Sequence, residues 1–313
     1  MTITQDSDPV IAARIESVLE PLGVRGYVHA VDIDSGVEVG LDADTDVVTA
    51  SVFKLPVLVE LARQYEAGAL DPRQRIHVGA DERRTDGPTG LSILLDDVEL
   101  SLRDLSVLMM SVSDNRATDL ITDLVGLDSV NATMRSFGLE RTVVPVDCDA
   151  LFRMMAEDLG ESLGELEVRL RAGTLTAADL AQLQSSRVSN LESNDRTTPR
   201  EITTLLAAVW RDEVIGAAAA AEVRRVLGLQ AWSHRLVAGF PDSRVKVSGK
   251  TGTLFFIRNE AGVVEYPDGG RYAVGVFLRE SSLELRHPDA DRAIGTVARV
   301  AVDALRSSQG LPV

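Results

Sequence analysis

The chain has 313 residues, a formal net charge of −16 and a single cysteine. A protein this acidic lacks the basic stripe that attracts nucleic acid or anionic lipid, so we expect a small-molecule substrate and neither of those partners. One cysteine cannot form an internal disulfide, and the four histidines do not have zinc-ligand spacing. We therefore expect no metal and no cofactor, and we expect a monomer.

The first residues, MTITQDSDPV, contain two aspartates and lack both the basic and the apolar region of a signal peptide. No apolar run reaches the roughly 18–20 residues that cross a bilayer. We expect a cytoplasmic protein as the sequence is written, or a secreted one if an upstream leader has been removed.

The predicted elements begin with a short amphipathic helix at about 11–22. The stretch that follows alternates apolar and polar residues and breaks at DSG (34–36), which is typical of a β-hairpin. Over 51–210 apolar residues recur three and four positions apart, which predicts helices. Within this block Ser101 and Asp104 have the spacing of a capping box, which predicts a helix start.

Strand patterns return near the carboxyl end of the chain. Apolar and β-branched residues dominate 244–254, 262–266 and 271–280, and the turn PDGG joins the last two stretches. An amphipathic helix at 288–308 closes the chain. The strands of the predicted sheet are therefore split in the sequence around the helical block.

This order of elements predicts an α/β fold of the α+β type, in which helices flank an antiparallel sheet and a mostly α subdomain is inserted. We expect one domain over 1–313. Its α/β subdomain comes from 1–48 and 211–313. Its α subdomain spans 49–210 and includes an acidic, helix-rich insertion at 147–193.

The use of lysine is unusual. Lys54, Lys246 and Lys250 are the only lysines among 32 basic residues, so the other 29 are arginine. An ammonium group can lose its proton when it is buried, whereas a guanidinium cannot. A position that keeps lysine in an arginine-rich protein is therefore a candidate for a catalytic base.

Two S-x-x-K patterns occur, and their predicted local structure separates them. Ser51 and Lys54 begin a predicted helix, where positions three apart share a face, so the amine can reach the hydroxyl. Ser243 and Lys246 enter a predicted strand, where an odd offset sends the side chains to opposite faces. Only the first pair can act as nucleophile and base.

Two further motifs follow in order. SDN (113–115) follows an apolar helix pattern, and KTG (250–252) lies in a strand pattern. S-x-x-K, SDN and KTG together are typical of class A β-lactamases and penicillin-binding proteins. The chain resembles the class A β-lactamase-like serine hydrolases of that superfamily over nearly its whole length, and NDRTTP (194–199) resembles the end of their omega loop. The resemblance implies a β-lactamase/transpeptidase-like fold.

Ser51 would attack a carbonyl carbon with Lys54 as the base, and Ser113 would relay a proton to the leaving nitrogen. The resemblance implies that the backbone amides of Ser51 and Thr253 stabilise the oxyanion, and that Lys250 faces a substrate carboxylate. The predicted catalytic residues are Ser51, Lys54, Ser113 and Lys250. The predicted substrate-binding residues are Asn115, Thr251, Gly252, Thr253 and Arg258. We expect Asp114 to accept backbone hydrogen bonds.

The sequence lacks the E-x-x-L-N pattern whose glutamate activates water for deacylation in class A enzymes. Possible substitutes are Glu157, Asp158, Glu192 and Asp195, although Asp195 is better suited to hold a loop; His234 fits a surface or packing role. Three functions stay open. The protein is a β-lactamase, a cytoplasmic amidase, esterase or transacylase acting on a carboxylate-bearing metabolite, or a sensor that captures β-lactams and releases them slowly.

Overall fold

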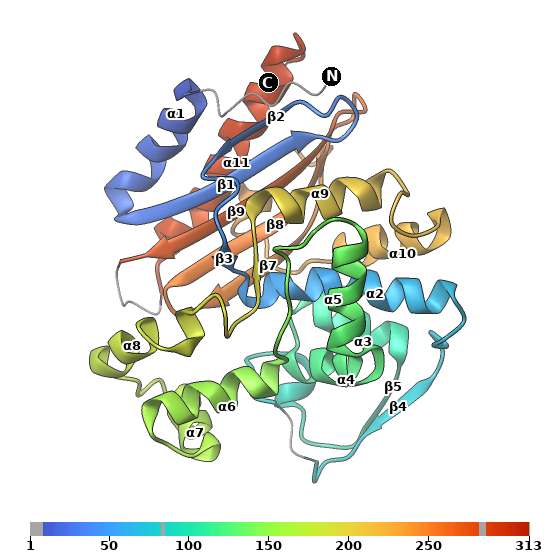
Figure 1. Ribbon diagram of the computed structural model, residues 1–313, viewed down its shortest axis with the longest axis vertical. Coiled ribbons are helices and arrows are strands. Elements are labelled where there is room, and N and C mark those ends of the chain that lie inside the picture. The colour runs from blue at the N-terminus through green and yellow to red at the C-terminus, as the bar shows by residue number, and fades with distance from the viewer. Residues whose placement is uncertain (1–8, 83–84, 282–285, 313) are drawn as a thin grey trace. The chain divides into compact units, whose positions relative to one another are not determined.

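The structure is a computed structural model that describes residues 9–82, 85–281 and 286–312. The first eight residues, on which the expectation about a leader rested, lie outside the described residues. The chain forms two compact units (Figure 1). The sheet unit consists of Met1–Val52, Thr197–Val214 and Gln230–Val313, and the helical unit consists of Phe53–Arg196 and Ile215–Leu229.

The sheet unit is built on a five-stranded antiparallel sheet with the order β2-β1-β9-β8-β7, so β7 is an edge strand. Tyr272, Val274 and Val276 alternate toward one face and join the hydrophobic core. Because β7 ends the sheet, one side of its backbone is left without a neighbouring strand. The strands are β1 (Val24–Asp32), β2 (Glu38–Leu41), β7 (Lys246–Leu254), β8 (Ile257–Glu265) and β9 (Arg271–Glu280).

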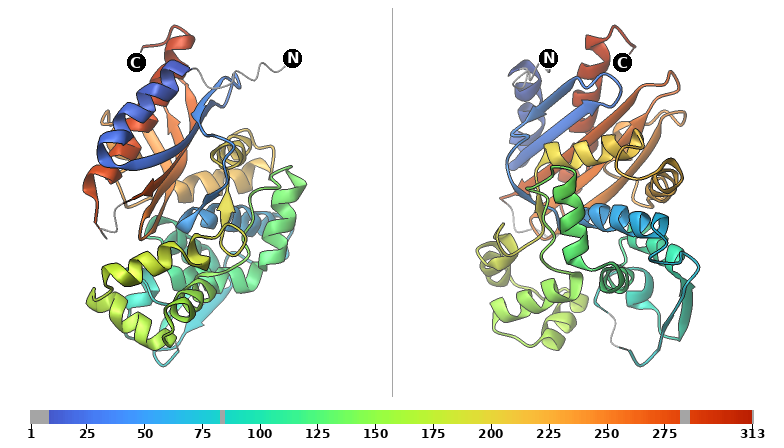
Figure 2. Two further views of the ribbon diagram at one scale, coloured as in Figure 1. Left: turned by 60° about the vertical axis from the view of Figure 1, so that its left-hand side comes forward. Right: turned by 45° about the vertical axis from the view of Figure 1, so that its right-hand side comes forward.

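Helices cover both faces of this sheet (Figure 2). On one face, α1 (Pro9–Leu19) and α11 (Pro288–Ser308) pack their apolar stripes against β1 and β9. On the other face, α9 (Pro199–Trp210) packs against the same two strands, and Gly275 leaves room for the side chain of Ile202. Shorter elements of this unit are η1 (Glu20–Leu22), β3 (Val47–Val48), η2 (Ala50–Phe53) and η5 (Leu236–Gly239).

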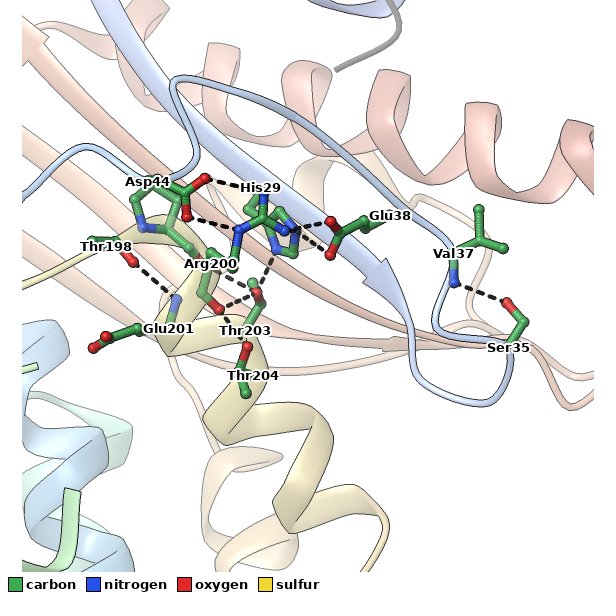
Figure 3. A network of polar contacts seen from close by, with 11 residues as sticks. His29, Ser35, Val37, Glu38, Asp44, Thr198, Arg200, Glu201, Thr203 and Thr204 are labelled. Carbon is green, nitrogen blue, oxygen red and sulfur yellow. Dashed lines mark hydrogen bonds and ion pairs between the residues drawn. The ribbon is translucent and has the colours of Figure 1, made fainter. Parts of the chain in front are cut away.

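A buried histidine fixes α9 to the sheet (Figure 3). His29 Nδ1 lies 2.5 Å from Thr203 Oγ1, and Nε2 lies 3.2 Å from Glu38 Oε2. Arg200 joins the network through ion pairs with Glu38 at 2.5 Å and Asp44 at 2.7 Å. Burial lowers the pKa of His29, which favours a neutral ring at neutral pH. The network therefore ties α9 to β1 and β2.

The helical unit is arranged around α2 (Lys54–Glu66), which packs against α3, α4, α5 and α10. Ser101 caps α3 by accepting a hydrogen bond from the Asp104 amide at 3.3 Å, as the sequence predicts. The other helices are α3 (Leu102–Ser111), η3 (Gly90–Ile93), α4 (Asn115–Val125), α5 (Leu127–Ser136), α6 (Cys148–Leu159), α7 (Leu163–Ala172), α8 (Ala177–Gln184), η4 (Arg187–Ser189) and α10 (Ala217–Leu227); β6 is Arg196–Thr197.

The predicted fold class is confirmed, and the predicted subdomain limits differ from the units in three places, of which the smallest is 49–52, predicted for the α subdomain but part of the sheet unit. Helix α9 lies in the sequence range predicted for the α subdomain but packs on the sheet. Helix α10 lies in the range predicted for the α/β subdomain but packs on α2 and α3. A further difference is the hairpin of β4 (Arg75–Val78) and β5 (Val98–Ser101) inside the range predicted as helical. The strands are too short for periodicity to identify them.

None of the helices in the described residues has the length and apolar character needed to span a membrane.

Candidate active site

Lys54 is completely buried at the start of α2. Its Nζ donates hydrogen bonds to the carbonyl oxygen of Ser113 at 2.9 Å and to Asn115 Oδ1 at 2.9 Å, and lies 3.3 Å from Ser113 Oγ. Burial lowers the pKa of Lys54, while the nearby Cys148 and Asp114 act in the opposite direction. A neutral amine has two N–H bonds, so these two acceptors would satisfy both and leave the lone pair free to take a proton.

The loop that carries Ser113 is held in an unusual conformation. The φ angle of Ser113 is +63°, in the left-handed region that few residues other than glycine adopt. Asp114 maintains the turn, because its carboxylate accepts hydrogen bonds from the amides of Leu91 at 2.6 Å and Ala117 at 3.0 Å. This is the backbone-accepting role expected of Asp114. Strained loops of this kind persist where the surroundings over-determine them, often at functional sites.

Asn115 connects Lys54 to a neighbouring segment of the helical unit. Its Nδ2 donates to the carbonyl oxygen of Asp86 at 2.9 Å, which fixes the orientation of the amide. Its Oδ1 accepts from Lys54 and also faces the thiol of Cys148 at 3.5 Å. Burial raises the pKa of Cys148 well above its usual value, so the thiol stays protonated. Sequence reasoning missed Cys148 because a lone cysteine carries no spacing signal.

Ser51 lies in η2 of the sheet unit, and Gly252 of β7 lies against the same segment. A Cβ atom on Gly252 would be 2.6 Å from the carbonyl oxygen of Thr49 and 3.2 Å from the amide nitrogen of Val52. Only glycine allows this approach. Asn259 adds a clasp from β8, since its Nδ2 donates to the Thr49 carbonyl at 2.9 Å. The structure thus brings the predicted nucleophile segment together with the KTG strand.

Lys250 is completely buried, and its Nζ donates to the carbonyl oxygen of Thr251 at 2.7 Å. Across the β7–β8 pair, Thr251 is opposite Glu260, another buried residue. Burial raises the pKa of Glu260 to about 7, although the positive charges of Arg235 and Lys250 act in the opposite direction. The KTG strand is therefore backed by a carboxyl group that is partly protonated at neutral pH.

Arg235 contacts β7, and sequence reasoning overlooked it. It is buried, and its guanidinium donates to the carbonyl oxygens of Gly252 and Asn259, both at 3.0 Å, and to Thr253 Oγ1 at 2.7 Å. An ion pair with Asp291 at 2.8 Å balances its charge. Arg235 thereby fixes the residue whose amide we expect to bind the oxyanion. No pattern in the sequence around Arg235 indicated these contacts.

Arg258 takes a different position from the one that its expected role requires. Lys250 and Thr253 are an odd number of positions apart in β7, so they point to opposite faces, and Arg258 is opposite Thr253. Its guanidinium forms ion pairs with the buried Glu280 and with Asp291, the latter at 3.5 Å. The geometry favours a structural role for Arg258. Its role in carboxylate binding stays a prediction that this placement does not favour.

The possible substitutes for the missing glutamate are placed on the insertion and beside it. Glu157 and Asp158 both form ion pairs with Arg187, at 2.9 Å and 2.6 Å. Glu192 is exposed, whereas Asp195 is buried and accepts a long hydrogen bond of 3.5 Å from the Val146 amide. Burial raises the pKa of Asp195 well above its usual value. This contact is consistent with the loop-holding role expected of Asp195.

The other sequence candidates lie apart from these contacts. Lys246 is exposed and forms an ion pair with Glu265 at 3.4 Å, while His234 is exposed and packs edge-on against Trp232. Within the described ranges, no cluster of three or more histidine, cysteine or acidic side chains is arranged to hold a metal ion.

The fold is that of class A β-lactamases. The chain superposes on a β-lactamase from Sphaerobacter thermophilus with a TM-score of 0.75, at 24% identity, over 97% of this chain and 98% of that one. A variant of a reconstructed class A enzyme, the last common ancestor of Gram-negative bacteria, gives a TM-score of 0.75 at 20% identity, over 95% and 98% of the two chains. PBP-A gives a TM-score of 0.74 at 18% identity, over 97% and 98%.

The sequence comparisons specify the family. A family model described as "Beta-lactamase enzyme family" matches residues 10–305. The chain belongs to this family. A curated relative from Streptomyces cacaoi, named "Beta-lactamase regulatory protein BlaB", is 29% identical over 303 residues, which cover 93% of this chain and 96% of that protein.

Proposed function

We propose that this protein is a β-lactamase-like serine hydrolase that opens a β-lactam or a related amide through an acyl-enzyme on Ser51. Ser51 Oγ bonds to the carbonyl carbon as its proton passes to Lys54 Nζ. The carbon–nitrogen bond then breaks, and the nitrogen takes a proton through Ser113 Oγ. We further propose that Lys250 binds a carboxylate of the substrate and that the Thr253 amide binds the oxyanion.

The state of Lys54 carries this proposal. The amine is fully buried, and Ser113 and Asn115 provide two acceptors at 2.9 Å. A permanently charged lysine in such a place would normally bind a carboxylate. In the part of the chain that the structure describes, no carboxylate forms a hydrogen bond or ion pair with Lys54. This favours a neutral amine that can act as a base.

We expect deacylation, the second half of the reaction, to be the slow step. Glu157 and Asp158 are occupied by Arg187, and no carboxylate among the described residues forms a hydrogen bond with Asn115. General-base assistance is typically worth about 10²–10⁴-fold, so water would attack the acyl-enzyme slowly without it. We therefore propose rapid acylation followed by slow deacylation, with Lys54 as the remaining base.

A second function is favoured by the same feature. A protein that acylates quickly and deacylates slowly can work as a β-lactam sensor. The relative from Streptomyces cacaoi is named a β-lactamase regulatory protein, which supports this alternative. An amidase, esterase or transacylase that transfers the acyl group to an acceptor other than water is the third possibility.

Intact-protein mass spectrometry after incubation with penicillin G tests the proposal. We expect an adduct of the penicillin mass on the wild type and on Ser243→Ala, and none on Ser51→Ala. An adduct on Ser51→Ala would refute the mechanism. Stopped-flow measurements with a chromogenic cephalosporin separate the alternatives. A burst with slow turnover supports the hydrolase, a single stoichiometric burst supports the sensor, and acceleration by an added amine or alcohol supports acyl transfer.

A further inference from the structure

A cavity of about 350 Å³ lies entirely within the helical unit, between α2, α3 and α10. Leu58 and Ala62 of α2 form one apolar wall, and Ala218 and Ala219 of α10 form another. The volume falls in the range of about 300–1,000 Å³ that small-ligand sites occupy. This space is therefore large enough for a ligand.

The sequence of α10 explains the cavity. The helix begins with five alanines at 217–221, which favour helix formation but carry only a methyl group. It packs beside α2 and α3 (Figure 2). Short side chains at Ala218 and Ala219 cannot fill the space in front of α2, so a pocket that is partly open to solvent remains between the helices, and larger residues would fill it.

Two polar groups at the cavity lack partners. The hydroxyl of Tyr65 is buried and has no hydrogen-bond partner among the described residues. Arg103, an exposed residue, also lines the cavity; its positive charge and the negative charge of Glu222 both act on this hydroxyl, and its guanidinium forms no ion pair within the described part of the chain. A buried hydroxyl and a guanidinium that lack partners are both able to donate hydrogen bonds to a bound molecule.

The carboxylates at the cavity are already engaged. Glu66 accepts a hydrogen bond from the Gly216 amide at 3.1 Å, where it precedes the start of α10. Glu222 forms an ion pair with Arg225 at 2.6 Å. The polar groups that remain are donors, and one of them is a cation. The complementary ligand has an apolar body and an anionic hydrogen-bond acceptor.

We propose that this cavity binds a small aromatic monocarboxylate, with its ring between α2 and α10 and its carboxylate at Tyr65 and Arg103. Leu58 lies one helical turn after Lys54 on α2, and α3 leads into the loop that carries Ser113. The ligand therefore contacts the two helices that support the proposed base. The proposed site does not use Ser51.

Benzoate is the probe, and isothermal titration calorimetry measures its binding to the full chain. We expect binding to the wild type and equally to Ser51→Ala, because the cavity does not use the nucleophile. Benzamide, which has the same ring and no charge, should bind more weakly. Arg103→Gln should raise the Kd for benzoate about tenfold through the loss of a charge-assisted contact. Tyr65→Phe should also weaken binding.

The variant Ala219→Leu places a larger side chain in the cavity and should abolish benzoate binding while the thermal unfolding midpoint is kept or raised. Benzoate binding that Ala219→Leu, Arg103→Gln and Tyr65→Phe all leave unchanged would overturn the proposal, as would no binding to the wild type. If Ala219→Leu fails to fold, the other two variants decide. Because Ser51→Ala is expected to bind normally, failure here is distinguishable from failure of the proposed hydrolase function.

Discussion

Two buried arginines of the sheet unit and the buried Lys54 of the helical unit are held by different kinds of partner. In the sheet unit, Arg235 and Arg258 are buried and form ion pairs with Asp291, which Arg235 reaches at 2.8 Å. In the helical unit, Lys54 is buried against a carbonyl oxygen and the amide of Asn115. Arginine keeps its proton in any protein, and pairing with a carboxylate stabilises the charge. Lysine without such a pair can become neutral.

The buried arginines therefore have a structural role, whereas Lys54 is the residue that we propose transfers protons. The arginines of the sheet unit keep β7 and its neighbours in place, as the hydrogen bonds of Arg235 to Gly252 and Thr253 indicate. Lys54 has the burial and the acceptors that a base requires. Changes in the sheet unit should therefore alter geometry and substrate choice, and changes at Lys54 should alter the chemistry.

The largest expected effect comes from Lys54. Both Lys54→Ala and Lys54→Arg should slow acylation by a fluorescent penicillin about 10²–10⁴-fold, because a general base is lost in each case. In the wild type, burial lowers the pKa of Lys54, so the acylation rate should rise with pH as the amine loses its proton. The exposed Lys246→Arg is the matched control and should behave as wild type. Substantial activity in Lys54→Arg would mean that Lys54 serves as a cation only.

The next largest effect concerns Gly252, whose backbone lies close to the Thr49 carbonyl in the sheet unit. Gly252→Ala places a Cβ atom 2.6 Å from the Thr49 carbonyl, so the segment that holds Ser51 must move. A displacement of about 1 Å in a reacting group can cost roughly 10²-fold, and we expect a loss of that size in the acylation rate. Gly164→Ala, which adds a methyl group in open space on α7, should have no effect. Equal rates for Gly252→Ala and wild type would show that the Ser51 segment tolerates displacement.

A smaller effect should separate Lys250 from Arg258. Lys250→Ala should reduce acylation by carboxylate-bearing penicillins by about 1.5–3 kcal/mol and reduce hydrolysis of neutral nitrophenyl acetate much less. Arg258→Ala should affect both substrates alike and lower the midpoint of urea unfolding, because the buried Glu280 would lose its arginine partner and keep only its contact with His287. If Arg258→Ala selectively impairs the carboxylate substrates instead, the role first expected from the sequence would be restored.

The sequence predicted the sheet strands better than the positions of their charged residues. Alternation and β-branched residues marked β1, β7 and β9, although the buried residues of β7 include Ser248, Lys250 and Thr251. The strand β8 was recognised only from Gly262 onward, although it begins at Ile257. Arg258 and Glu260 made the earlier part resemble a loop. Their burial depends on partners that are distant in sequence, which no local pattern reveals.

In the candidate site, too, the sequence predicted the motif residues better than the contacts that they make in the fold. Motif spacing identified Ser51, Lys54, Ser113 and Asn115, and the structure groups the last three in the helical unit. The face to which Arg258 points required the register of β7 and β8, which the sequence alone did not provide. Arg235 and Cys148 reach their positions through tertiary packing, so nothing in the sequence near them indicated a contact with the motifs.

The smallest effect concerns Glu260, a buried charge of the sheet unit that departs from the rule of pairing. Its Oε2 accepts a hydrogen bond from the Leu236 amide at 2.7 Å, and its Oε1 has no partner among the described residues. Burial raises the pKa of Glu260 from 4.5 to about 7. The native carboxyl therefore keeps a proton that the unfolded chain has already lost. This contribution to stability is complete below the unfolded pKa of 4.5 and is lost as the pH rises through about 7.

Glu260→Gln should remove this dependence, because the amide is neutral at every pH and its oxygen can still accept from Leu236. Relative to wild type, we expect the variant to gain stability between pH 5 and pH 8, by on the order of 2 kcal/mol. Urea unfolding at both pH values measures the difference, and Glu265→Gln, at the far end of β8, serves as the control. The same gain in Glu265→Gln would mean that the effect is not specific to Glu260, whereas a loss of stability in Glu260→Gln at pH 8 would mean that Glu260 is charged in the native state. Lys250 and Arg235 would then be its ion-pair partners, and the sheet unit would follow its rule of pairing throughout.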